Sequence, residues 1–251
     1  MLFAPFGRAI NGADSEPIGH GAVKNPAAGG GRWVDIPPER LVSWIVTFAH
    51  RHGGAGPVIR DGSVVTFTAE DGATAECHPP FPPVPPDEGT PLADEVRGTA
   101  EALAAHAAAD RTVGVLLVRL GGYAVGVFTG SPPRLIDSKT GSRPVHGRSA
   151  AGGWSQHRFA RRRENQAAVA LRATADAAAE VFGRYGPDRL DAVVLGGDKR
   201  SAARLRDDVR LQKYLSRATG RFLVVPDPRL AVLRDIPRAF LAIRIRVTEP
   251  K

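Results

Sequence analysis

Between residues 139 and 163 the chain gathers residue types that could act on a polyanion. The stretch holds seven lysines and arginines, two histidines and no acidic side chain. Gly147, Gly152 and Gly153 lie within it, and glycine permits backbone angles and close approaches that side chains forbid. Gln156 carries an uncharged amide that can both donate and accept hydrogen bonds. Because like charges repel, we expect a long irregular loop that lies in solvent and is open to phosphate groups.

The side chains of this loop that we expect to bind RNA are cationic or aromatic. Trp154 either stacks on a base or ribose or anchors the loop to its domain. The basic candidates are Lys139, Arg143, His146, Arg148, His157, Arg158, Arg161, Arg162 and Arg163. The plain alternative is a basic linker that tethers nucleic acid and performs no chemistry.

Strands and helices on both sides must position this loop. Before it, residues 112–120 read as a buried strand, and residues 123–130 and 133–139 as short antiparallel strands. After it, a helix over 164–183, a strand over 190–197, a helix capped by Asp198 and running to Gly220, and strands over 221–227 and 241–250 are predicted. Alternating strands and helices predict an α/β domain with a mixed sheet flanked by helices.

The first part of the chain has a different character. Residues 1–31 read as a loosely ordered extension. An amphipathic helix follows, with apolar residues at Leu41, Trp44, Ile45 and Phe48, and then a meander of three strands joined by Asp-Gly turns. A proline-rich connector and an alanine-rich helix complete a smaller α+β domain. The predicted parts are therefore 1–31, 32–108 and 109–251.

Charge divides the chain at the same place. Residues 1–108 hold 7 basic and 13 acidic side chains, whereas residues 109–251 hold 27 and 13. A strongly basic second part points to a polyanionic partner. Cys77 is the one cysteine, which excludes a disulfide framework and a multi-cysteine zinc site. With no apolar run long enough to span a bilayer and no signal peptide pattern, we expect a cytoplasmic protein with no membrane partner.

The sequence "HGRSAAGGWSQHRFARRREN", set between a strand and a long helix, resembles the middle domain of archaeal and eukaryotic class-one peptide-release factors. In that family a glycine-glycine-glutamine loop precedes an arginine-phenylalanine-alanine-arginine helix start, which here is residues 158–161. Aligning this start places the family's glutamine on Trp154. The spacing from Gly153 to Gln156 instead resembles the release-factor-like peptidyl-tRNA hydrolases of the Vms type, including their actinobacterial branch. The resemblance covers residues 109–251.

This resemblance implies a function for the loop. It would enter the peptidyl-transferase centre of a large ribosomal subunit, where the ester that joins a stalled nascent chain to tRNA is hydrolysed. The implied catalytic residues are Gln156, Gly152 and Gly153, and the implied partners are ribosomal RNA and peptidyl-tRNA, with no cofactor and no DNA. A glutamine amide is no general base near neutral pH, so Gln156 would hold a water against the ester carbonyl while a loop N–H stabilises the oxyanion.

Two other functions stay open from the residues alone. Histidine is the usual acid–base side chain, so His157 or His146 with Arg148 could cleave a phosphodiester near the tRNA 3′ end. A ribosome-binding or RNA-binding module without catalysis is the second. A metal-dependent nuclease built on Asp137, Asp191 and Asp198 is disfavoured, because Asp198 is placed as a helix cap and Asp191 opens the strand at its other end.

Overall fold

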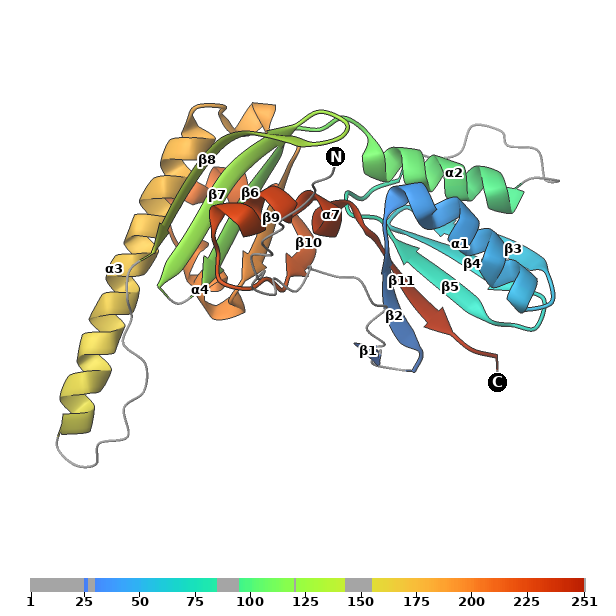
Figure 1. Cartoon of the computed structure of the whole chain (residues 1–251), viewed down its shortest axis with the longest axis horizontal. Coiled ribbons are helices and arrows are strands. Elements are labelled where there is room, and N and C mark those ends of the chain that lie inside the picture. Colours follow the sequence, from blue (N-terminus) through green and yellow to red (C-terminus); the bar gives the residue numbers. More distant parts are fainter. Residues whose placement is uncertain (1–24, 27–29, 85–94, 120, 143–154, 251) are drawn as a thin grey trace, which may run out of the picture.

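The computed structural model describes residues 25–26, 30–84, 95–119, 121–142 and 155–250, with the side chains of 25–26 and 155–163 left out. Figure 1 shows two β-sheets side by side, each with its own helices. The strands are β1 (Asn25–Pro26), β2 (Arg32–Ile36), β3 (Ala55–Asp61), β4 (Val64–Ala69), β5 (Thr74–His78), β6 (Val113–Arg119), β7 (Gly122–Thr129), β8 (Arg134–Ser142), β9 (Ala192–Gly197), β10 (Ala218–Leu223) and β11 (Ile243–Thr248). The helices are α1 (Pro38–Arg51), α2 (Glu95–Ala108), α3 (Ser155–Gly183), α4 (Lys199–Leu205), α5 (Val209–Leu215), α6 (Leu230–Asp235) and α7 (Pro237–Leu241), with a 3₁₀ turn at Pro187–Arg189.

The first sheet has six strands in the order β1-β2-β11-β5-β4-β3, all antiparallel. Its strands alternate as a half-buried sheet requires: in β4, Val65, Phe67 and Ala69 are buried while the residues between them are partly exposed. The buried side chains meet one face of α1 and α2, where Leu41, Ile45 and Leu103 are fully buried. The predicted helix and three-stranded meander are confirmed as α1 and β3–β5.

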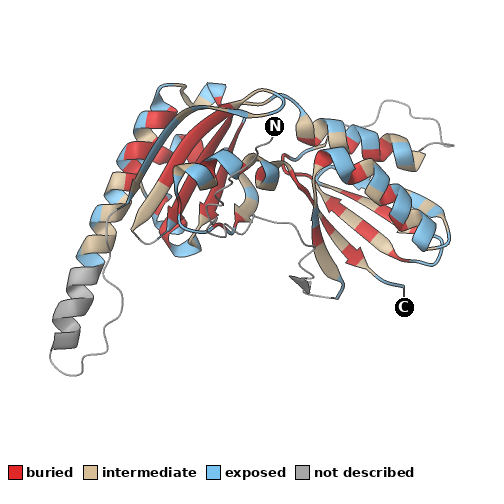
Figure 2. Cartoon of the chain, viewed as in Figure 1, coloured by how far each residue is buried: buried red, intermediate tan, exposed pale blue. Residues whose placement is uncertain are grey.

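The second sheet has five strands in the order β10-β9-β6-β7-β8. Strands β10, β9 and β6 run parallel, and β7 and β8 continue antiparallel. Residues 113–118 of β6 are all buried, because this central strand is covered on both faces (Figure 2). One face packs against α3, α4 and α5, and the other against α6, α7 and Phe81. The predicted fold class, a mixed sheet flanked by helices beside a smaller α+β part, is confirmed.

The second part differs from the predictions in several places, the first of which is the helix after β9. The helix expected from Asp198 to Gly220 is two helices, α4 and α5, because Asp208 caps a new helix by accepting a hydrogen bond from the backbone N–H of Arg210. Gly220 belongs to β10 instead of ending a helix. The Asp198 cap itself is confirmed: its carboxylate accepts from the backbone N–H of Ser201 at 2.9 Å.

The predicted last strand exists as β11, but it does not join the sheet of the basic part. It lies between β2 and β5 in the first sheet, with Ile245 opposite both Val34 and Cys77. Ile243, Ile245 and Val247 are buried there under α1 and α2. A cut at residue 108 alone therefore does not separate the two sheets. The division into domains at 32–108 and 109–251 stays a prediction.

Candidate functional site

Helix α3 positions the predicted catalytic glutamine. The helix has 29 residues and begins at Ser155, nine residues before the helix predicted over 164–183 and three before the helix start at Arg158 that the resemblance implies. Gln156 therefore lies in the first turn of a helix and not in the predicted irregular loop. Figure 1 shows this end of α3 projecting away from the second sheet. A rise of 1.5 Å per residue places Ser155 about 17 Å along the helix axis from Gln166. The backbone of Gln156 thus lies at the far end of a helical arm.

The other half of α3 is buried in the protein core. From Thr174 to Phe182 it contributes Ala175, Ala177, Ala178 and Val181, whose small side chains let it pack closely on the sheet. Phe182 is fully buried against Tyr214, with ring centroids 5.6 Å apart. By contrast Glu164 and Asn165, the first residues of α3 whose side chains are described, are exposed. The helix is therefore fixed at one end and free of the core at the other.

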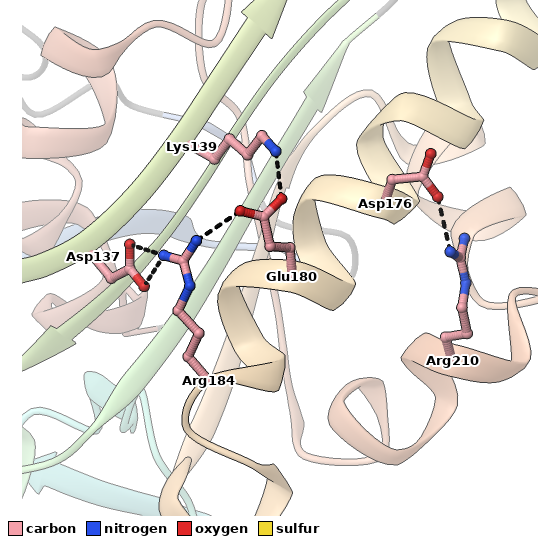
Figure 3. A network of polar contacts seen from close by, with 6 residues as sticks. All are labelled: Asp137, Lys139, Asp176, Glu180, Arg184 and Arg210. Atoms are coloured by element: carbon pink, nitrogen blue, oxygen red, sulfur yellow. Dashed lines mark hydrogen bonds and ion pairs between the residues drawn. The ribbon is translucent and has the colours of Figure 1, made fainter.

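Ion pairs add to this anchoring on the side of β8 (Figure 3). The Nη1 atom of Arg184 lies 2.9 and 2.8 Å from the two carboxylate oxygens of Asp137, and its Nη2 atom lies 2.6 Å from Glu180. Lys139 also donates to Glu180. The hydrogen bond from Lys139 holds the pKa of the Glu180 carboxyl below its ordinary value, with a smaller contribution from Arg184. These four side chains tie the end of α3 to the strand that precedes residues 143–154.

A second ion pair joins α3 to α5. Arg210 donates to Asp176 of α3 at 2.8 Å and to Asp208, the residue that caps α5. Hydrogen bonds to the carboxylates of Asp208 and Asp176 raise the pKa of the Arg210 guanidinium above its ordinary value. Sequence reasoning assigned an anchoring role to none of these residues: Lys139 was predicted to bind RNA, and Asp137 was considered only for a metal site. The spacing of four between Glu180 and Arg184 was the available signal, since such pairs meet on one helix face.

The predicted site residues fall into three groups. The backbones of Gln156, His157, Arg158, Arg161, Arg162 and Arg163 lie on α3, but their side chains are outside the described residues. Arg143, His146, Arg148, Gly152, Gly153 and Trp154 lie outside the described residues altogether. Lys139 is described on β8, where its ammonium is paired with Glu180. The catalytic and RNA-binding roles of all these residues stay predictions.

The carboxylates considered for a metal site have other partners. Asp137 pairs with Arg184, and an Asp191 oxygen accepts from the backbone N–H of Thr112 at 2.7 Å. Asp198 caps α4 at the opposite end of β9 from Asp191. Within the described ranges, no three His, Cys, Asp or Glu side chains come together as a metal would need, and no helix is both long and apolar enough to cross a membrane. Cys77 is buried, which raises the pKa of its thiol.

The sequence of the basic part matches a known family. Residues 111–246 match the Actinobacteria/Chloroflexi VLRF1 release factor, acVLRF1. The chain belongs to the acVLRF1 family. The match begins just before β6 and ends within β11, so it includes Gln156, the whole of α3 and the second sheet. This acVLRF1 protein is thus release-factor-like and related to translation.

Solved structures and curated proteins add little to this assignment. The chain aligns with the crystal structure of the archaeal translation termination factor aRF1 at 13% identity and a TM-score of 0.39, over 83% of this chain and 66% of that one. A second structure, described as an archaeal protein, aligns at 12% identity and a TM-score of 0.35, over 81% and 62%. The acVLRF1 chain spans less than two thirds of the length of either structure. No curated protein matches it significantly.

Proposed function

We propose that this acVLRF1 protein hydrolyses the ester of peptidyl-tRNA and so releases nascent chains from stalled large ribosomal subunits in the cytoplasm. The observation that carries the proposal is the family match over residues 111–246, which contains the arm and Gln156. Its partners are the ribosomal RNA of the large subunit and the peptidyl-tRNA that the subunit holds. The reaction needs no cofactor.

The form of α3 supports a role in reaching a recessed site. Its base is packed on the sheet and held by Asp137, Glu180 and Arg184, so the far end extends from a fixed base. Its first turn contains no acidic residue, and the unpaired N–H groups at a helix N-terminus favour negative charge. In our proposal the arginines at 158 and 161–163 contact RNA phosphates while Gln156 reaches the ester.

The chemistry is one of positioning. Gln156 accepts a hydrogen bond from a water molecule and holds it against the ester carbonyl carbon, while an N–H of the glycine loop donates to the carbonyl oxygen. The water oxygen forms a bond to that carbon, and the bond from the carbon to the ribose oxygen breaks. One water proton passes to the ribose oxygen, and the peptide leaves as a carboxylic acid that loses the other proton to solvent. Holding the reactants in this geometry contributes several kcal/mol to such a step.

A release assay tests the proposal. Isolated large subunits that carry a labelled nascent chain are incubated with wild type, with Gln156→Ala and with Gln166→Ala. Gln166 is the matched control, since it is another glutamine of α3, located where the helix meets the folded body. We expect release by wild type and Gln166→Ala and a loss of at least 100-fold with Gln156→Ala, the size of effect expected for one transition-state contact.

Other outcomes of this assay would lead to other functions. Equal release by all three proteins would remove Gln156 from the mechanism. Binding to the subunit without release by any of them would make the protein a binding module. An intact 3′ end on the product tRNA is expected for ester hydrolysis, whereas a shortened tRNA would indicate a ribonuclease that uses His157 or His146 with Arg148.

A further inference from the structure

A pocket of about 390 Å³ lies at the base of the arm. It is formed where the carboxyl ends of the parallel strands β6 and β9 meet α4 and the middle of α3, and its lining includes Leu171 and Thr174 of α3. Gln156 is eleven residues before the first α3 residue of the lining, Ala167, which corresponds to about 17 Å of helix. The pocket is therefore distinct from the predicted catalytic end.

The neutral polar groups of this pocket are already used within the protein. The hydroxyl of Thr174 donates to the carbonyl oxygen of Ala170 at 2.8 Å. The hydroxyl of Ser201 donates to Asp198 at 2.7 Å, and the same carboxylate oxygen accepts from the Ser201 N–H. These contacts hold the first turn of α4 in place. The groups that remain to meet a ligand are guanidinium groups.

Three arginines line the pocket, and all three are exposed. Arg200 and Arg204 lie four residues apart on α4, which places them on the same helix face. Arg119, at the end of β6, donates from Nη1 to the carbonyl oxygen of Val225 at 3.2 Å. Within the described residues none of the three has a carboxylate at ion-pair distance. Asp198 is the acidic residue of the lining, so the pocket carries a net charge of about two positive units.

Some arginines of the basic part are neutralised, whereas the three in the pocket are not within the described part of the chain, and their position around one hollow sets them apart from the other unpaired arginines of the surface. Arg184, Arg210, Arg217 and Arg221 each pair with an aspartate or glutamate. Two unpaired cations at a spacing of four destabilise a helix slightly, and an anion that bridges them removes this repulsion. Guanidinium groups bind phosphate oxygens with two parallel hydrogen bonds, so the chemistry of the cluster suits a phosphate.

We propose that this pocket binds a phosphate group of an RNA backbone, so that the protein contacts RNA at the base of the arm as well as at its end. The inference rests on the proposed function, because ribosomal RNA is the polyanion that the arm would meet. The arginines are at the protein surface, where a phosphate within a long strand can reach them. The excess of 27 basic over 13 acidic residues in 109–251 favours such a polymer over a lone small anion.

Binding of large ribosomal subunits at a series of salt concentrations tests the pocket. The variant is Arg200→Gln/Arg204→Gln. The matched control is Arg234→Gln/Arg238→Gln, which also removes two exposed arginines four residues apart, on helices that pack on the other face of the sheet. We expect the log–log slope of affinity against salt to fall by about 1.5 for the pocket variant and to change little for the control. Equal melting temperatures verify the folds.

Several results would overturn the proposal. Equal losses for both pairs would show that net charge alone matters, and an unchanged slope for the pocket variant would show that no phosphate contact is lost. A second experiment measures the binding of adenosine monophosphate by calorimetry. If this nucleotide binds wild type but not the pocket variant, while subunit binding is unaffected, the occupant is a mononucleotide and the RNA proposal is wrong.

The pocket and the proposed function fail separately. The binding slope does not depend on ester hydrolysis, so Gln156→Ala is expected to keep the wild-type slope. Pocket-dependent binding without any peptide release would reject the hydrolase and retain the pocket. Peptide release together with subunit binding that does not depend on Arg200 and Arg204 would contradict the pocket proposal and leave the hydrolase proposal standing.

Discussion

Arg184, the residue after α3, and Asp137 on β8 form a close ion pair in which one guanidinium nitrogen lies 2.9 and 2.8 Å from the two carboxylate oxygens. The aspartate is the more buried partner, with 14% of its side chain exposed against 53% for the arginine. The pair connects the two elements that flank residues 143–154 in the sequence. Its strength therefore bears on how firmly the base of the arm is held.

Replacing Arg184 and replacing Asp137 are expected to lower the stability of the protein by different amounts. Arg184→Gln leaves the carboxylate of Asp137 mostly buried and without its cation, whereas Asp137→Asn leaves an exposed arginine that still contacts Glu180. We expect Arg184→Gln to lower the melting temperature more than Asp137→Asn, and the difference to shrink in high salt. Thermal unfolding at low and high ionic strength measures both. The opposite order would contradict the assigned geometry.

The three consecutive arginines at 161–163 are predicted to contact RNA. Changing all three to alanine is expected to weaken binding to large subunits and to reduce the log–log salt slope by about 2 to 3, because fewer counterions are released. The control changes Arg189, Arg229 and Arg234, three exposed arginines elsewhere in the basic part. An identical slope for the two triple variants would argue against RNA docking by the arm.

The turn from β9 into α4 depends on Gly197. Its φ is 103°, and a Cβ atom there would lie 2.1 Å from the carbonyl oxygen of Val118. Gly72, in the turn before β5, has a φ of 89° but nothing within 4 Å of its Cβ position. We expect Gly72→Ala to lower the free energy of unfolding by about 1–2 kcal/mol and Gly197→Ala by about 3 kcal/mol or more. Urea unfolding compares them, and equal losses would show that the contact with Val118 is unimportant.

Asp198 should make stability depend on pH. The hydrogen bond from the Ser201 hydroxyl holds the pKa of its carboxyl below the ordinary value, so the folded protein favours the carboxylate. The stabilisation is complete above the unfolded pKa, about 3.9, and is lost as the pH falls through the lower folded value. At pH 7 Asp198→Ala should cost about 1 kcal/mol as a lost helix cap.

Urea unfolding at pH 7, 5, 3 and 2 checks this prediction. The difference in free energy of unfolding between wild type and Asp198→Ala should be constant from pH 7 to 5. It should become smaller at lower pH, as the carboxyl of the wild type becomes protonated. Asp207→Ala serves as the control, because Asp207 is exposed and lies outside both caps of this region. A gap that stays constant down to pH 2 would contradict the role of the carboxylate.

Local patterns in the sequence predicted many of the elements correctly. The two Asp-Gly turns identified the strands that they join, β4 and β5 among them, and the spacing of Leu41, Ile45 and Phe48 identified α1. The Asp198 cap was found because it precedes a helix directly. These features depend on neighbours within a few residues, which is the range over which backbone hydrogen bonding and side-chain periodicity act.

Features that depend on distant contacts were missed. The sequence of β11 predicts a strand but does not show which of the two sheets the strand joins. Strand pairing depends on which sheet edges are free in the fold. The break at Asp208 was missed because the apolar pattern continues across it. The pocket arginines were also missed as a group, since β6 and α4 are about eighty residues apart and meet only in the fold.

Placing β11 between β2 and β5 has a consequence for the order of folding. Residues 32–36 and 74–78 have no sheet hydrogen bonds to each other and are joined only through residues 243–248. During synthesis the first sheet therefore cannot be completed until the whole basic part has been translated, and until then β2 and β5 each have an unpaired edge. A long closing segment of this kind slows folding and makes assembly of the acidic part contingent on the basic one.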